Sequence, residues 1–190
     1  MDMQYIEDIT FENKDFSEEK LQKGDYESCT FLNCNFSNSD ISKIRFIECE
    51  FINCNISLAN LYQTELQDIT FKDCKMLGLR FDKCSDFAFS IKFENCQLNH
   101  SSFFKKKLSR TLFMKSKLHE VDFTECITST KTFDNCDLLN AIFKNTDLQN
   151  TDLRNSLNFI IDPENNHIRG AKFSLESVKG LLTKYNIIIE

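Results

Sequence analysis

The 190-residue chain contains 41% hydrophobic and 27% charged residues, enough apolar material for one folded domain. It begins with neither a basic segment nor an apolar run, and no stretch holds the roughly 18 to 20 apolar residues of a membrane helix, so we expect a cytoplasmic protein without a membrane segment. The net charge is −6, divided into −8 for residues 1–100 (18 acidic, 10 basic) and +2 for residues 101–190 (11 acidic, 13 basic), which disfavours direct binding to nucleic acid.

A five-residue period starts at Phe11. Every fifth residue in this first block is large and apolar: Phe11, Phe16, Leu21, Tyr26, Phe31, Phe36, Ile41, Phe46, Phe51, Ile56, Leu61, Leu66, Phe71, Met76 and Phe81. The residue two before each of these central positions is usually small, whereas Lys14 and Glu19 near the start are charged and costly to bury. Neither a helix nor a flat strand has a period of five, and we expect the first turns to form a loose or partly open cap.

The period is interrupted once and then resumes. From Phe71 to Phe93 the step is 22 residues, which predicts a bulge or a small protruding corner within residues 82–92 and not a domain boundary. The second block then runs through Phe93, Leu98, Phe103, Leu108, Phe113, Leu118, Phe123, Thr128, Phe133, Leu138, Phe143, Leu148 and Leu153. Lys106 and Lys131 fall at the small inward position, so we expect local distortion at both.

Residues twenty positions apart are alike. Phe11, Phe31, Phe51 and Phe71 form one such column, and Leu98, Leu118 and Leu138 form another. Four sides of five residues give a coil of twenty, in which such residues stack about 4.8 Å apart. The outer column that includes Asn13, Asn33 and Asn53 predicts turns made by asparagine, which explains how the chain manages with four Gly and one Pro.

After Leu153 the pattern lapses. Residues 156–170 contain loop formers such as Pro163 and Gly170, and the unit ending at Phe173 is expected to rejoin the stack. Ser174 can cap a short helix with apolar residues on one face, and residues 187–189 follow as a short strand. We therefore divide the chain into a β-helix over residues 1–173 and a C-terminal element over residues 174–190 that covers the open end.

The runs CTFLNCNFSNSDI, CDLLNAIF and NTDLQNTDLRN resemble the A(D/N)LXX units of pentapeptide-repeat proteins over about residues 10–155. The resemblance is nearest in type to the Qnr and MfpA quinolone-resistance proteins. It implies an all-β fold, a right-handed quadrilateral parallel β-helix, here with a short C-terminal helix. In Qnr and MfpA type members a C-terminal extension joins two rods, which implies a homodimer; an intramolecular lid is the alternative. The residues proposed for the dimer interface are Val178, Leu181, Leu182, Tyr185, Ile187 and Ile189.

The sequence contains no recognisable catalytic or cofactor motif. All nine cysteines occupy the small inward position, where a thiol acts as a compact apolar filler, and the three histidines have no zinc-ligand spacing. The basic run from Lys105 to Lys117 has no clustered aromatic residues and is expected to be a solvated face. We expect a non-enzymatic protein with no cofactor and no bound metal.

Two partner hypotheses remain. The resemblance implies a rod that mimics duplex DNA, binds DNA gyrase or topoisomerase IV and protects the enzyme from quinolones. The candidate acidic surface comprises Asp25, Asp40, Glu48, Glu50, Glu65, Asp68 and Asp73. The alternative is a protein-interaction scaffold with an unrelated partner, because this fold does not determine function.

Overall fold

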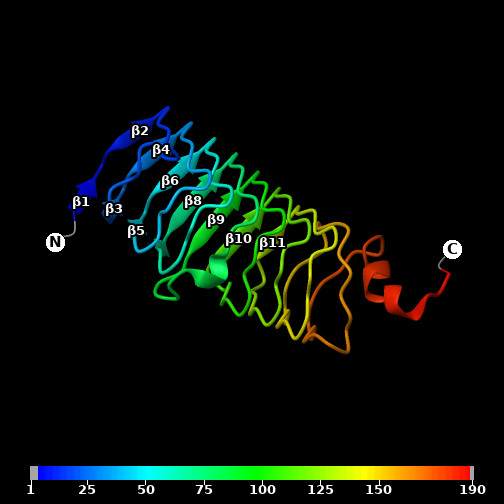
Figure 1. Ribbon diagram of the computed structural model, residues 1–190. Coiled ribbons are helices and arrows are strands. Elements are labelled where there is room, and N and C mark those ends of the chain that lie inside the picture. Colours follow the sequence, from blue (N-terminus) through cyan, green and yellow to red (C-terminus); the bar gives the residue numbers. More distant parts are fainter. Residues whose placement is uncertain (1–3, 189–190) are drawn as a thin grey trace.

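The computed structural model describes residues 4–188, and the chain winds as a right-handed quadrilateral parallel β-helix (Figure 1). Each strand pairs in parallel with the strand one coil away, so that Phe31 is the register partner of both Phe11 and Phe51. The predicted vertical column of phenylalanines is thereby confirmed. No helix in the described residues is long and apolar enough to cross a membrane.

Two of the four sides form continuous sheets. The β1 side has the strand order β1-β3-β5-β7 and the β2 side the order β11-β10-β9-β8-β6-β4-β2. On the β1 side the strands are β1 (Gln4–Glu7), β3 (Gly24–Glu27), β5 (Arg45–Ile47) and β7 (Glu65–Gln67). On the β2 side they are β2 (Thr10–Glu12), β4 (Thr30–Leu32), β6 (Glu50–Ile52), β8 (Ile69–Lys72), β9 (Ile91–Glu94), β10 (Thr111–Met114) and β11 (Phe133–Asp134). The other two sides, here the Phe36 side and the Phe81 side, are joined by isolated parallel bridges such as those from Asn35 to Asn55 and from Asp40 to Asn60.

The square corners come from a left-handed residue two positions after most of the central residues. Asn13, Asn33 and Asn53 each have φ of 53°, a conformation that asparagine tolerates better than most residues. On the Phe36 side the turn closes with a hydrogen bond from the Ser39 N–H to the Phe36 carbonyl at 3.1 Å, and φ of 57° at Asn38 makes this a type II turn. The Asn53 side-chain amide also donates to the Asn33 side-chain oxygen at 2.8 Å, which confirms the predicted ladder.

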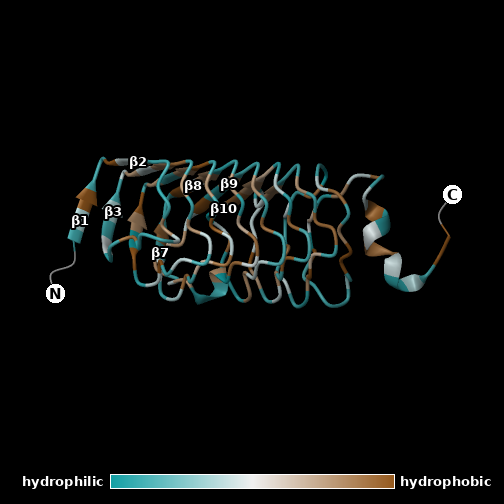
Figure 2. Ribbon diagram, turned by 45° about the horizontal axis from the view of Figure 1, so that its top comes forward, coloured by the Kyte–Doolittle hydropathy of each residue, from teal (hydrophilic) through white to brown (hydrophobic). Residues whose placement is uncertain are grey.

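The interior is a stack of aromatic rings followed by leucines. Ring centroids lie 4.6 Å apart for Phe31 and Phe51 and 4.9 Å apart for Phe93 and Phe113, and these four rings are at most 2% exposed. Figure 2 shows hydrophobic and hydrophilic residues alternating along the ribbon around every coil, as expected when only some positions of each side point inward. Like residues stack because each coil repeats the backbone of the one before it, so that each inward side chain packs on its counterpart in the next coil.

The two extra residues of the 22-residue step bulge from the β1 side, as predicted. After the 3-10 helix η1 (Phe81–Lys83), residues 84–90 replace the strand that would have continued the β1 side, while Phe71 still pairs with Phe93 on the β2 side. Phe89 is buried within this segment, whereas Phe87 is 68% exposed. The extra length therefore projects outward while an aromatic ring still fills the core.

The two lysines at the inward phase are accommodated in different ways. Lys106 is only 3% exposed, and its ammonium donates to the Cys84 carbonyl and to an Asp86 carboxylate oxygen, each at 2.7 Å. Lys131 is exposed instead, and Thr132 takes the inward place beside it. The expected distortion is therefore found at Lys131, whereas the expectation for Lys106 is wrong, because its coil keeps the regular inward and outward pattern and its ammonium finds acceptors inside the rod.

The C-terminal element covers the last coil (Figure 1). Residues 156–170 still follow the solenoid path, with parallel bridges at Leu157 and His167, and Lys172 pairs with Asp152 next to Phe173. The helix expected from Ser174 takes the form of two 3-10 helices, η2 (Val178–Leu181) and η3 (Thr183–Tyr185). Ile187 and Ile188 form no strand, and Ile189 lies outside the described residues.

Close backbone contact holds this element in place. The Ile161 N–H donates to the Gly180 carbonyl at 3.1 Å, and a side chain at Gly180 would collide with the Phe159 carbonyl oxygen. Lys184 forms ion pairs with Asp162 and Glu164, the latter at 2.7 Å. Only a glycine allows the 3-10 segment to approach the last coil this closely.

Candidate protein-binding surfaces

The cysteines belong to the core. All nine are free and buried, and the thiols of Cys54 and Cys74 lie 3.2 and 3.3 Å from the carbonyl oxygens of Phe31 and Phe51. Burial raises the pKa of the Cys49, Cys84 and Cys126 thiols to about 12, from an ordinary value of 9.0. Residues 4–188 hold no group of three or more His, Cys, Asp or Glu side chains that could bind a metal.

We expect these thiols to be unreactive in the folded protein. At about pH 8, Ellman's reagent should modify the native protein only as it unfolds, and all nine thiols should react at once in denaturant. Because the folded state keeps its protons up to a higher pH than the unfolded state, the stability that the thiols contribute should fall as the pH rises above about 9. Urea unfolding at about pH 8 and pH 10 measures this fall. A native thiol that reacts at the rate of a free cysteine would contradict the prediction.

Three of the seven candidate carboxylates lie together at the corner between the β1 and β2 sides. Glu48 and Asp68 occupy equivalent corner positions in successive coils, and Glu50 lies two residues after Glu48. Arg110, two coils further on, pairs with Asp68 at 3.0 Å, and the Ser90 hydroxyl donates to the same carboxylate at 2.6 Å. This corner is therefore acidic at Glu48 and Glu50 and neutralised at Asp68.

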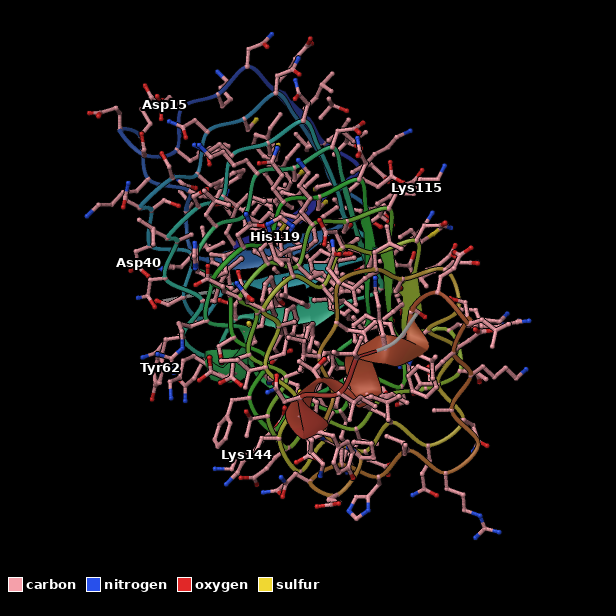
Figure 3. All side chains as sticks on the ribbon, turned by 90° about the vertical axis from the view of Figure 1, so that its right-hand side faces the viewer. Asp15, Asp40, Tyr62, Lys115, His119 and Lys144 are labelled. Carbon is pink, nitrogen blue, oxygen red and sulfur yellow. The ribbon has the colours of Figure 1, made fainter. Side chains whose placement is uncertain are left out.

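The other four candidate carboxylates are dispersed. Asp25 and Glu65 lie on the β1 side with Arg45 between them, and Arg45 pairs with Asp25 at 2.9 Å. Asp73 lies at the next corner, where it accepts a hydrogen bond from Asn95. Asp40 lies on the Phe81 side and pairs with Lys23 at 3.2 Å. In Figure 3, which views the C-terminal end of the rod, Asp40 and Lys115 lie on opposite sides of the cross-section.

A denser group of carboxylates lies in the first coil, and it was missed from the sequence. Glu7, Asp8 and Glu12 are exposed there, and Glu27 lies one coil away on the β1 side. The Tyr5 hydroxyl donates to Glu27 at 2.8 Å, and this hydrogen bond, together with the negative charges of Glu27 and Glu7, raises the pKa of Tyr5 to about 12. A charge count restricted to residues 4–20, which gives six acidic and two basic residues, would have revealed this group.

The C-terminal element encloses a groove of about 620 Å³ against the last coils. Of the six residues proposed for a dimer interface, Leu182 and Ile187 line this groove, opposite Leu139, Leu157 and Ile160. Val178 and Leu181 are half-buried, and Leu181 packs on the solenoid core. Tyr185 is exposed and donates to Glu164, and Ile189 lies outside the described residues.

The fold defines a class of protein, the β-solenoid with five residues on each side of its coils. Comparison with known protein families identifies the family. The pentapeptide repeat region model matches residues 20–103 and 44–123, and the model for pentapeptide repeats in eight copies matches residues 132–157. The chain belongs to the pentapeptide-repeat family.

Among solved structures, two trypsin-treated variants of QnrB1, described as a plasmid-mediated fluoroquinolone resistance protein, resemble the chain with a TM-score of 0.56 each. Their identities are 17% and 18%, with coverage of 98% and 97% of this chain and 100% and 99% of theirs. HetL from the cyanobacterium Nostoc sp. strain PCC 7120, involved in heterocyst differentiation regulation, matches at 13% identity and a TM-score of 0.45, over 90% of this chain and 85% of its own. At these identities the likeness establishes the fold alone. A search of curated proteins found no match.

Proposed function

We propose that the chain is a non-enzymatic, cytoplasmic protein-binding rod whose recognition surface is its exterior. The observation that supports this best is the ladder core. From Phe11 to Phe143 the inward positions are filled by stacked side chains, which leaves the outward-facing residues available for recognition. QnrB1, whose fold is similar, is described as a fluoroquinolone resistance protein.

The finer proposal is that the partner is DNA gyrase or topoisomerase IV, which the rod would bind as a mimic of duplex DNA. The exposed carboxylates Glu48 and Glu50 support it, and so does the charge of −8 in residues 1–100. The ion pairs at Asp25, Asp40 and Asp68 reduce the negative charge of the same half. A scaffold for a different protein partner is the second candidate, supported by that mixed charge.

A supercoiling assay separates the two candidates. The wild-type protein should restore gyrase or topoisomerase IV activity in the presence of ciprofloxacin, and a Glu48→Lys, Glu50→Lys variant should restore less. Glu18→Lys, Glu19→Lys is the matched control, because it makes the same change of charge at two exposed residues that follow Phe16, between the Phe36 and Phe81 sides and away from that corner. If the wild-type protein neither rescues nor inhibits either enzyme at any concentration, the topoisomerase proposal fails and the scaffold stands.

We also propose that the rod dimerises through its C-terminal element. Tyr185, Ile187 and Ile188 leave apolar surface exposed beside the groove, and burying such surface favours association. Light scattering of the wild-type chain and of an Ile187→Asp variant tests it, with a dimer expected for the first and a monomer for the second. A monomeric wild-type chain would leave the element as a lid on its own solenoid.

A further inference from the structure

The two ends of the solenoid differ. The C-terminal element covers the last coil, whereas β1 and β2 are edge strands at the N-terminal end in the described part of the chain. Phe11 stacks on Phe31 at a centroid distance of 4.9 Å and is only partly buried, while Phe31 is fully buried. The first coil therefore presents a ring face and a strand edge of the kind that every later coil covers with its neighbour.

The hydrogen bonds of later coils show which groups of the first coil face outward. The N–H of Thr30 donates back to the Ile9 carbonyl, and the Leu32 carbonyl accepts from the Asn13 N–H. Glu50 and Ile52, one coil on, repeat this pattern with Cys29 and Asn33 as partners. By the same geometry, the Thr10 N–H and the Glu12 carbonyl of β2 point away from the rod, ready for a parallel strand.

The negative charge of the first coil determines which kind of strand could pair with the open edge of β2. Residues 4–20 contain six carboxylates and two lysines, a net charge of −4, and within residues 4–188 none of these six carboxylates forms an ion pair. Like charges would oppose each other if β2 of a second copy approached, which disfavours a dimer through this edge. A cationic strand would be attracted instead.

We propose that the N-terminal coil binds an extended basic peptide of a partner protein by parallel strand addition to β2. The peptide places an aromatic side chain on Phe11, continuing the phenylalanine stack, and flanks it with Lys or Arg near Glu12 and Asp8. Its backbone accepts a hydrogen bond from the Thr10 N–H and donates one to the Glu12 carbonyl. This site is independent of the proposed topoisomerase surface and of the C-terminal groove.

The probe is fluorescein-labelled Val-Lys-Phe-Lys-Asn amide, titrated into the full chain and followed by fluorescence anisotropy. N-methylation of the Asn nitrogen removes the donor to the Glu12 carbonyl without changing charge, and it should weaken binding about tenfold. Replacing the peptide Phe by Ala should weaken binding by a similar factor, and replacing both Lys by Glu should abolish it. Raising the salt concentration should weaken binding of the parent peptide.

The protein variants are Glu12→Lys, which should abolish binding, and Glu176→Lys as the matched control at the opposite end, which should not alter it. Circular dichroism checks that both variants keep the fold. The proposal is overturned if the parent peptide does not bind, or if the N-methylated peptide binds equally well, which would indicate charge attraction without strand pairing. A concentration-dependent dimer that Glu12→Lys abolishes would also overturn it, because the edge would then be occupied by a second copy.

Discussion

Phe93→Ala is expected to lower the free energy of unfolding by about 3 to 5 kcal/mol. The Phe93 ring is fully buried between Phe71 and Phe113, at centroid distances of 5.4 and 4.9 Å, and it meets the rings of Phe81 and Phe103 edge-on. Removing it opens a cavity in the middle of the stack, which cannot close because the coils above and below are fixed by their own strand pairs.

Urea unfolding followed by circular dichroism measures this loss. Phe87→Ala is the matched control, because the same side chain is removed from a position that is 68% exposed, and we expect a change of no more than about 0.5 kcal/mol. Equal losses for the two variants would mean that the phenylalanine stack does not stabilise the fold.

Lys106→Ala is expected to lower the free energy of unfolding by about 2 to 4 kcal/mol, the second large effect. The ammonium of Lys106 binds the Cys84 carbonyl and Asp86, and lies 4.9 Å from the centre of the Phe89 ring. Without it, a buried carbonyl loses its hydrogen bond and the bulge loses its attachment to the next coil. The exposed Asp86 contributes less than a buried partner would, since water screens its charge.

The matched control is Lys107→Ala, the exposed neighbour, for which a change within about 0.5 kcal/mol is expected. Amide hydrogen exchange adds a local measurement. Residues 84–90 should exchange faster in Lys106→Ala, while β8 and β9 keep their protection because they pair directly with each other. If Lys106→Ala and Lys107→Ala are equally stable, the buried lysine does not anchor the bulge.

The architecture followed from the sequence because one backbone unit repeats with a fixed spacing. Counting places Phe31, Phe51 and Phe71 above one another, and the 22-residue step from Phe71 to Phe93 indicates where the extra residues leave the coil. The role of Lys106 could not be predicted, because a lysine at the inward phase can either bury itself, as Lys106 does, or turn outward, as Lys131 does. The choice depends on whether acceptors lie within reach of the ammonium.

The candidate surface was less predictable than the core. Counting placed Glu48 and Asp68 in one column, but the ion pair between Asp68 and Arg110 spans 42 residues and depends on side-chain reach. The sequence also could not show that the C-terminal element forms 3-10 helices instead of one longer helix, because this geometry is coupled to the close contact of Gly180 with Phe159. Sequence periodicity determines where backbones lie, whereas charge neutralisation is decided by side-chain conformations.

The left-handed corners limit how this rod can change while keeping its shape. Of the three outward positions on each side, the corner favours residues that adopt positive φ, such as Asn33, Asn53 and Asn135, and β-branched residues are strained there. Adaptation to a new partner would thus proceed mainly through the two remaining outward positions, which are free to vary in charge and size. The corners therefore keep the shape of the rod, and the residues between them determine which partner it can bind.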